Sequence, residues 1–155
     1  MDWQFLYMSL AVKIVLAVFV SYSVCFDLYR DRIPNQLTRM MMFEGLFVQV
    51  AEYGTDGFTL YLKGVGALFL VTGLLYLLKA MRGGDCKFLI AAGGLLGPKG
   101  GIWLLTLSML IGALIGIHIL AADIHRTGRG RHYLHFGLPI YLGYLAMLLM
   151  GEYVM

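Results

Sequence analysis

The chain is a succession of long apolar runs separated by short polar segments, and this pattern restricts the fold more than any other feature. An α-helix needs about 20 predominantly apolar residues to cross a bilayer. The pattern therefore predicts an all-α, polytopic membrane protein with about six transmembrane helices, forming a single domain over residues 1–155. The six runs lie at residues 4–26, 37–51, 58–79, 85–97, 100–122 and 136–154.

The composition agrees with a chain whose solvent is the bilayer. Apolar residues make up 60% and charged residues 14%, whereas about a quarter of the residues of a soluble globular protein are charged. The first run is long enough to remain in the membrane, so we do not expect a cleaved signal peptide. The two cysteines, Cys25 and Cys86, form no paired CxxC pattern. A zinc or disulfide framework is therefore unsupported, and we expect neither a metal nor a cofactor.

The connecting segments alternate in charge, and this alternation predicts the orientation of the protein. Nine of the ten Lys and Arg residues in these segments fall in three alternate loops. The positive-inside rule places those three loops in the cytoplasm, with the protein in the inner membrane of the cell. Both termini then face outward. The basic residues of the three loops are Arg30, Arg32 and Arg39; Lys79, Arg82 and Lys87; and Arg126, Arg129 and Arg131.

The fourth apolar run is too short to cross the membrane in the usual way. From Gly84 to Gly97 a helix extends only about 21 Å, less than the hydrocarbon core of about 30 Å. Such a helix begins below the surface, or lies where the membrane is thinned or water enters. Asp85, at its start, is therefore expected close to the boundary between lipid and water.

Two aspartates are expected at the cytoplasmic edge of the membrane. Asp27 closes the first run in "CFDLYRDRIPNQLT", and Asp85 opens the fourth in "MRGGDCKFL". A carboxylate inside a membrane helix costs about 2.5–3.5 kcal/mol on insertion scales. One interpretation is that both simply mark helix ends in the headgroup region. Against it, the glycines before Asp85 permit positive φ and a close backbone approach, and a helix N-terminus favours its ionised form.

Two carboxylic acids close together can perform a particular reaction. They do not both ionise readily, so they share a proton and titrate as a pair. The ionised acid takes a proton from water while the protonated acid polarises a peptide carbonyl, which is the chemistry of aspartic proteolysis. The alternative is a non-enzymatic six-helix assembly or transport component, in which the acids bind protons or stabilise helix packing.

Two motifs resemble the signature motifs of the type IV prepilin peptidases, membrane aspartic proteases of the GxGD kind. They are "FDLYRDRIPN" at 26–35 and "GGDCK" at 83–87. The resemblance covers essentially the whole chain, including a late proline in "FGLPIYLGY". The second motif departs from the family pattern at Arg82, but its G-D-x-K core is intact. The resemblance implies that Asp27 and Asp85 are catalytic and that five neighbours support the site: Pro34, Asn35, Gly83, Gly84 and Lys87.

The same resemblance implies a substrate. It would be a prepilin-like protein with a short basic leader and an apolar helix, cleaved at the cytoplasmic face during pilus biogenesis. The small size is similar to the minimal Flp/Tad-type or preflagellin-type branch. Larger relatives carry an extra cytoplasmic domain with paired CxxC motifs, associated with N-methylation. This chain has two cysteines in all, so we expect peptidase activity without methyltransferase activity.

Several other polar residues remain open to more than one interpretation. Lys87 could act electrostatically on the acid pair or contact lipid phosphates. Glu44 and His118 could pair with each other or make separate polar contacts between helices. Cys25 and Cys86 are better explained as small packing residues than as nucleophiles. The basic segment "HRTGRGRHYLH" suits anionic lipid rather than nucleic acid, so we expect no nucleic-acid partner.

Overall fold

The computed structural model describes residues 10–30, 34–127 and 136–153. Within these ranges the chain forms helices and no strands, which confirms the all-α prediction. The first helix runs to Arg30 rather than to residue 26, so Asp27 lies inside its last turns instead of at its end. The helices are α1 (Leu10–Arg30), α2 (Asn35–Leu77), α3 (Gly83–Thr127) and α4 (Gly137–Tyr153).

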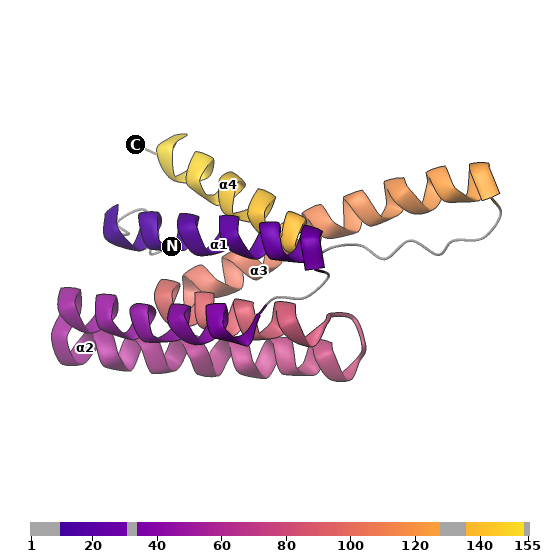
Figure 1. Ribbon diagram of the computed structural model, residues 1–155. Coiled ribbons are helices and arrows are strands. Elements are labelled where there is room, and N and C mark those ends of the chain that lie inside the picture. Colours follow the sequence, from indigo (N-terminus) through magenta and orange to yellow (C-terminus); the bar gives the residue numbers. More distant parts are fainter. Residues whose placement is uncertain (1–9, 31–33, 128–135, 154–155) are drawn as a thin grey trace.

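Helix α2 folds back on itself at Gly54. This residue has φ 60° and ψ −131°, a conformation that glycine adopts because it lacks a Cβ atom. The Tyr61 hydroxyl donates a hydrogen bond of 3.1 Å to the Met42 carbonyl, 19 positions earlier. The two halves of α2 therefore lie side by side and run in opposite directions (Figure 1).

Helix α3 repeats this arrangement at Gly97, which has φ 73° and ψ 176°. The next residue is Pro98, which has no backbone N–H and suits the first turn of a new helical segment. A Cβ atom on Gly101 would lie 2.9 Å from the Gly93 Cα, so the two halves of α3 approach closely. The buried Gln49 side chain donates a hydrogen bond of 2.5 Å to the Leu95 carbonyl and so fastens α2 to this bend.

Because α2 and α3 each fold back, the described residues trace six helical segments, where the sequence has six apolar runs. Within the part of the chain that the structure describes, two stretches, Asn35–Leu77 and Gly83–Ile119, are long and apolar enough to cross a membrane, and Gly137–Leu149 is a shorter apolar helix. The bend of α2 lies at the left end of the molecule in Figure 1, and the bend of α3 lies farther in, in the same half. The α2–α3 turn and the start of α4 lie toward the other end.

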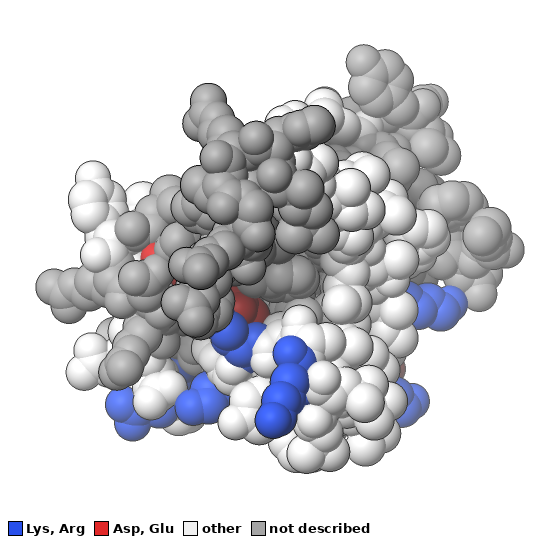
Figure 2. Space-filling model, turned by 90° about the vertical axis from the view of Figure 1, so that its right-hand side faces the viewer, with Lys and Arg blue, Asp and Glu red and all other residues white. Residues whose placement is uncertain are grey.

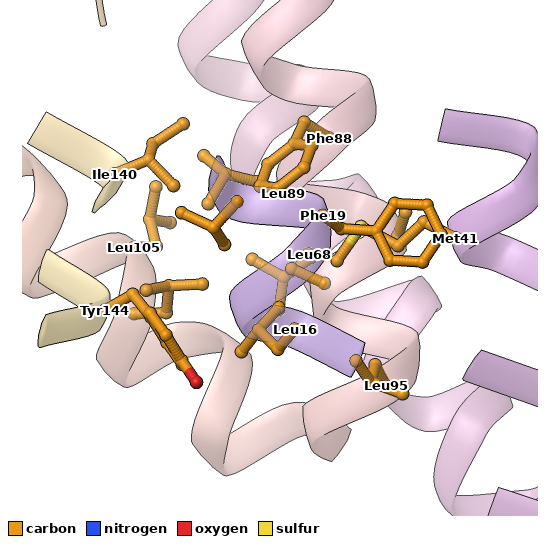
Figure 3. Packing of buried hydrophobic residues seen from close by; sticks show 14 of the residues in the cluster. Leu16, Phe19, Met41, Leu68, Phe88, Leu89, Leu95, Leu105, Ile140 and Tyr144 are labelled. Carbon is orange, nitrogen blue, oxygen red and sulfur yellow. The ribbon is translucent and has the colours of Figure 1, made fainter. Parts of the chain in front are cut away.

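The interior is formed by apolar side chains from all four helices (Figure 3). Leu16 of α1, Leu68 of α2, Phe88 of α3 and Ile140 of α4 are each fully buried in it. The outer surface is also rich in large apolar side chains, and Phe47 is 74% exposed. Exposed apolar surface on this scale marks a contact with another apolar phase or molecule.

Candidate active site

Asp27 lies near the end of α1 with 4% of its surface exposed. Its Oδ2 atom accepts a hydrogen bond of 2.9 Å from the backbone N–H of Gly137, the first residue of α4. The first four N–H groups of a helix have no acceptor within that helix. The Asp27 carboxylate therefore supplies an acceptor for the N-terminus of α4, where the helix dipole is also favourable to a negative charge.

Asp85 lies in the first turn of α3, as expected, and is 3% exposed. The two preceding glycines are half-buried and belong to the helix. Neither has a positive φ; among the described glycines, positive φ occurs at Gly54 and Gly97. Gly83 and Gly84 therefore do not use the positive φ values that glycine permits. Gly83 instead keeps its surroundings uncrowded, since an added Cβ would meet only the Tyr76 ring, at 3.4 Å.

The fold brings the two acids together from positions 58 residues apart. Asp27 lies close enough to Asp85 for a charge on one acid to act on the other, and so does the Arg82 guanidinium. Each acid also lies at the N-terminal end of a helix, α4 for Asp27 and α3 for Asp85. Figure 2 looks at this end of the molecule and shows Lys and Arg side chains around it, with acidic side chains visible among the surface atoms.

Lys87 and Asn35, one from each motif, link α3 to α2, and Pro34 directly precedes α2. The Lys87 ammonium donates a hydrogen bond of 3.1 Å to the Asn35 side-chain oxygen. Pro34 has an extended conformation, with φ −67° and ψ 136°, and caps α2. Its carbonyl accepts a hydrogen bond of 3.1 Å from the Leu37 N–H. The basic residue that acts on Asp85 is Arg82, which the sequence presented as a departure from the motif.

The Lys87–Asn35 hydrogen bond is solvent-exposed, so it is expected to contribute modestly to stability. Lys87→Gln and Asn35→Ala should each lower the free energy of unfolding by less than about 1 kcal/mol, because exposed charged contacts are screened by water. A double-mutant cycle on thermal unfolding in detergent measures the coupling, with the exposed Lys63→Gln as control. A loss above about 2 kcal/mol from either change would contradict an exposed, accessory role.

The other polar residues that the sequence singled out do not form a common contact within the described part of the chain. Glu44 and His118 are both exposed. Cys25 is exposed, whereas Cys86 is buried, and its thiol donates to the Thr72 carbonyl at 3.5 Å, in agreement with a packing role. Residues 128–135 of the basic segment lie outside the described residues, as do residues 31–33 of the first motif.

An open cavity of about 550 Å³ runs along the face of α1 that points away from Asp27. The Tyr22 and Phe26 rings are stacked in it with centroids 6.4 Å apart. Among the described residues its lining comes from one face of α1: Ser21, Tyr22, Cys25, Phe26 and Tyr29. This face of α1 is therefore largely aromatic and can accept an apolar segment.

Comparison with known protein families matches residues 14–117 to the type IV leader peptidase family, and this stretch contains both aspartates. The chain belongs to this family. Type IV leader peptidases are proteases, of the aspartic type. The comparisons with curated proteins and with solved structures gave no match. The family assignment thus depends on the region that holds the acid pair, and it confirms the resemblance inferred from the two motifs.

One contact of this leader peptidase was not anticipated from its sequence, namely that between Gly137 and Asp27. A glycine two positions before Pro139 does indicate the start of a helix. Nothing in that pattern specifies which side chain the helix N-terminus meets, because the donor is a backbone N–H 110 positions away from the carboxylate.

Proposed function

We propose that this leader peptidase is a membrane aspartic endopeptidase in which Asp27 and Asp85 form the catalytic pair. The observation that carries the proposal is that the fold buries two acids from separate helices, Asp27 of α1 and Asp85 of α3, close enough together for the charge of one to act on the other. Burying two acidic groups close together is costly, and such arrangements are concentrated at functional sites. A packing role alone does not require two acids on separate helices to approach each other.

The reaction requires the two acids in different protonation states. The ionised carboxylate accepts a proton from water as the water oxygen attacks the peptide carbonyl carbon, while the protonated acid donates to the carbonyl oxygen. The resulting tetrahedral intermediate collapses with cleavage of the C–N bond. The leaving nitrogen takes a proton from the first acid, and a hydroxyl of the intermediate returns a proton to the second acid, so both acids regain their starting protonation states. Sharing one proton between two neighbouring acids supplies both states at once.

We further propose that the whole chain is one membrane-embedded domain with six spans in the inner membrane and both termini outside. The two long apolar stretches and the apolar outer surface support membrane insertion. The acids lie at the end where Lys79, Arg82 and Lys87 also lie. By the positive-inside rule that end is cytoplasmic. Cleavage would therefore occur on the cytoplasmic side.

The proposed substrate is a prepilin-like protein, from which the enzyme removes a basic leader during pilus assembly. Family membership supports a leader peptide as the released product. The aromatic cavity along α1 suits the apolar helix that follows such a leader. We propose that the product is not methylated by this chain, because its sequence contains no paired CxxC motifs.

Cleavage in a reconstituted system tests this function. The purified protein in lipid vesicles is mixed with a prepilin-like substrate, and mass spectrometry identifies the new N-terminus of the product. We expect a single cut between the basic leader and the apolar helix, and no cut in a substrate lacking the leader. An intact substrate in the presence of folded protein would favour the alternative, a non-enzymatic assembly or transport component.

A further inference from the structure

Gly137 is the closest neighbour of the Asp27 carboxylate on α4, and it leaves no room for a side chain. Its N–H donates to Asp27 Oδ2 at 2.9 Å. A Cβ atom added at Gly137 would lie 2.8 Å from that oxygen and 3.0 Å from the Asp27 Cβ. Both distances are shorter than ordinary van der Waals contact between these atoms. Any other residue at position 137 would therefore displace the carboxylate or the start of α4.

Contacts with α3 and α1 hold the start of α4 in place, so the Asp27 carboxylate is the part that would move. Pro139 is fully buried. It packs against α3, where a Cβ atom on Gly112 would lie 3.4 Å from it. Further along α4, the Tyr144 hydroxyl donates a hydrogen bond of 2.7 Å to the Lys13 carbonyl of α1. Helix α4 is thus fastened to α3 near its first turn and to α1 beyond it.

We propose that Gly137 is a positioning residue for the cleavage reaction. Its N–H orients the Asp27 carboxylate toward Asp85, and its missing side chain lets α4 approach closely enough to do so. This inference rests on the proposed catalytic role of Asp27. It concerns a part of the chain beyond residues 14–117, where the family match ends, so the match does not address it.

The test is Gly137→Ala in the reconstituted cleavage assay, with kcat and KM measured separately. A misplaced catalytic group can cost about 10²-fold in rate, so we expect kcat to fall by about 10- to 100-fold with KM within about twofold. The matched control is Gly143→Ala on the same helix, whose Cβ would lie 2.7 Å from Ser108 Oγ and 3.0 Å from its backbone N. It crowds α4 equally, away from Asp27, and should leave kcat within about twofold.

Asp27→Asn, measured in parallel, separates failure of this inference from failure of the proposed function. If Asp27→Asn is inactive while Gly137→Ala retains the kcat of Gly143→Ala, the positioning role is overturned and the proteolytic function stands. If Asp27→Asn cleaves at the wild-type rate, the proposed function fails and the positioning role fails with it.

A stability cycle keeps the inference testable if Gly137→Ala folds poorly. Asp27→Ala removes the carboxylate that an added Cβ would touch first. Gly137→Ala should therefore lower the melting temperature strongly in the wild-type background and less in the Asp27→Ala background. Recovery of folded protein in the double variant supports the contact. If Gly137→Ala lowers the melting temperature equally in both backgrounds, or yields no folded protein in either, Gly137 acts in helix packing alone and the inference is overturned.

Discussion

Asp27→Asn and Asp85→Asn are each expected to reduce leader cleavage by about 10²–10⁴-fold, the usual contribution of a positioned acid or base. Asparagine has nearly the same shape as aspartate but can neither accept the proton of water nor donate a carboxylic proton. At position 27 it still offers an oxygen to the Gly137 N–H. The helices should therefore assemble normally, and the loss should appear in kcat.

For each variant, the cleavage rate is compared with the amount of folded protein in the membrane. Asp56→Asn is the matched control, because Asp56 is an exposed acid next to the Gly54 bend, at the opposite end of the molecule. It should cleave at the wild-type rate. Normal cleavage by either Asp27→Asn or Asp85→Asn would remove that residue from the catalytic pair.

Gly64→Ala is expected to have the largest effect on stability, lowering the free energy of unfolding by about 3 kcal/mol. Gly64 of α2 packs directly against α3, where an added Cβ would overlap the Gly93 carbonyl group and lie 3.0 Å from the Gly97 Cα. These atoms belong to the backbone of a sharp bend and cannot rotate aside as a side chain can. Helices α2 and α3 would have to separate, and small residues at such contacts are what allow helices to approach closely.

Gly66→Ala provides the comparison, since an added Cβ there meets nothing within 4 Å. Alanine favours helix over glycine by about 0.5–1 kcal/mol, so this variant should be neutral or slightly stabilised. Thermal unfolding in detergent measures both. Equal melting temperatures for the two variants would show that α2 and α3 do not pack through Gly64.

The apolar runs of the sequence predicted the helical segments well, but not how sharply the chain reverses between them. The runs that end at residues 51 and 97 were expected to be followed by short polar connecting segments. In the structure a single non-helical glycine, Gly54 or Gly97, makes each reversal. Hydropathy records where residues are polar, whereas the length of a reversal depends on φ and ψ at one glycine. That is why the runs located these turns without predicting their form.

The sequence motifs identified the acid pair but not all of its surroundings. Asp27 and Asp85 stand out because a carboxylate is rare in an apolar run. Gly137 does not stand out, since its contribution is a backbone N–H and an absent side chain. Arg82 was read as a deviation from a motif, and its attraction to Asp85 became visible only when the turn between α2 and α3 placed it. Residue types in the sequence do not indicate contacts that are made by a backbone N–H, by the absence of a side chain or across a turn.

The two arms of α3 differ greatly in length, and this affects how a substrate can reach the acids. The arm that carries Asp85 spans residues 83–96, whereas the second spans residues 98–127, which at 1.5 Å per residue is about 45 Å. In Figure 1 the long arm extends well past the other helices. In the membrane placement proposed above, a bilayer that accommodates the long arm would leave the short arm below the headgroup region. For the helical substrate proposed above, the segment around the scissile bond would have to unwind at that depth before water could attack the peptide carbonyl.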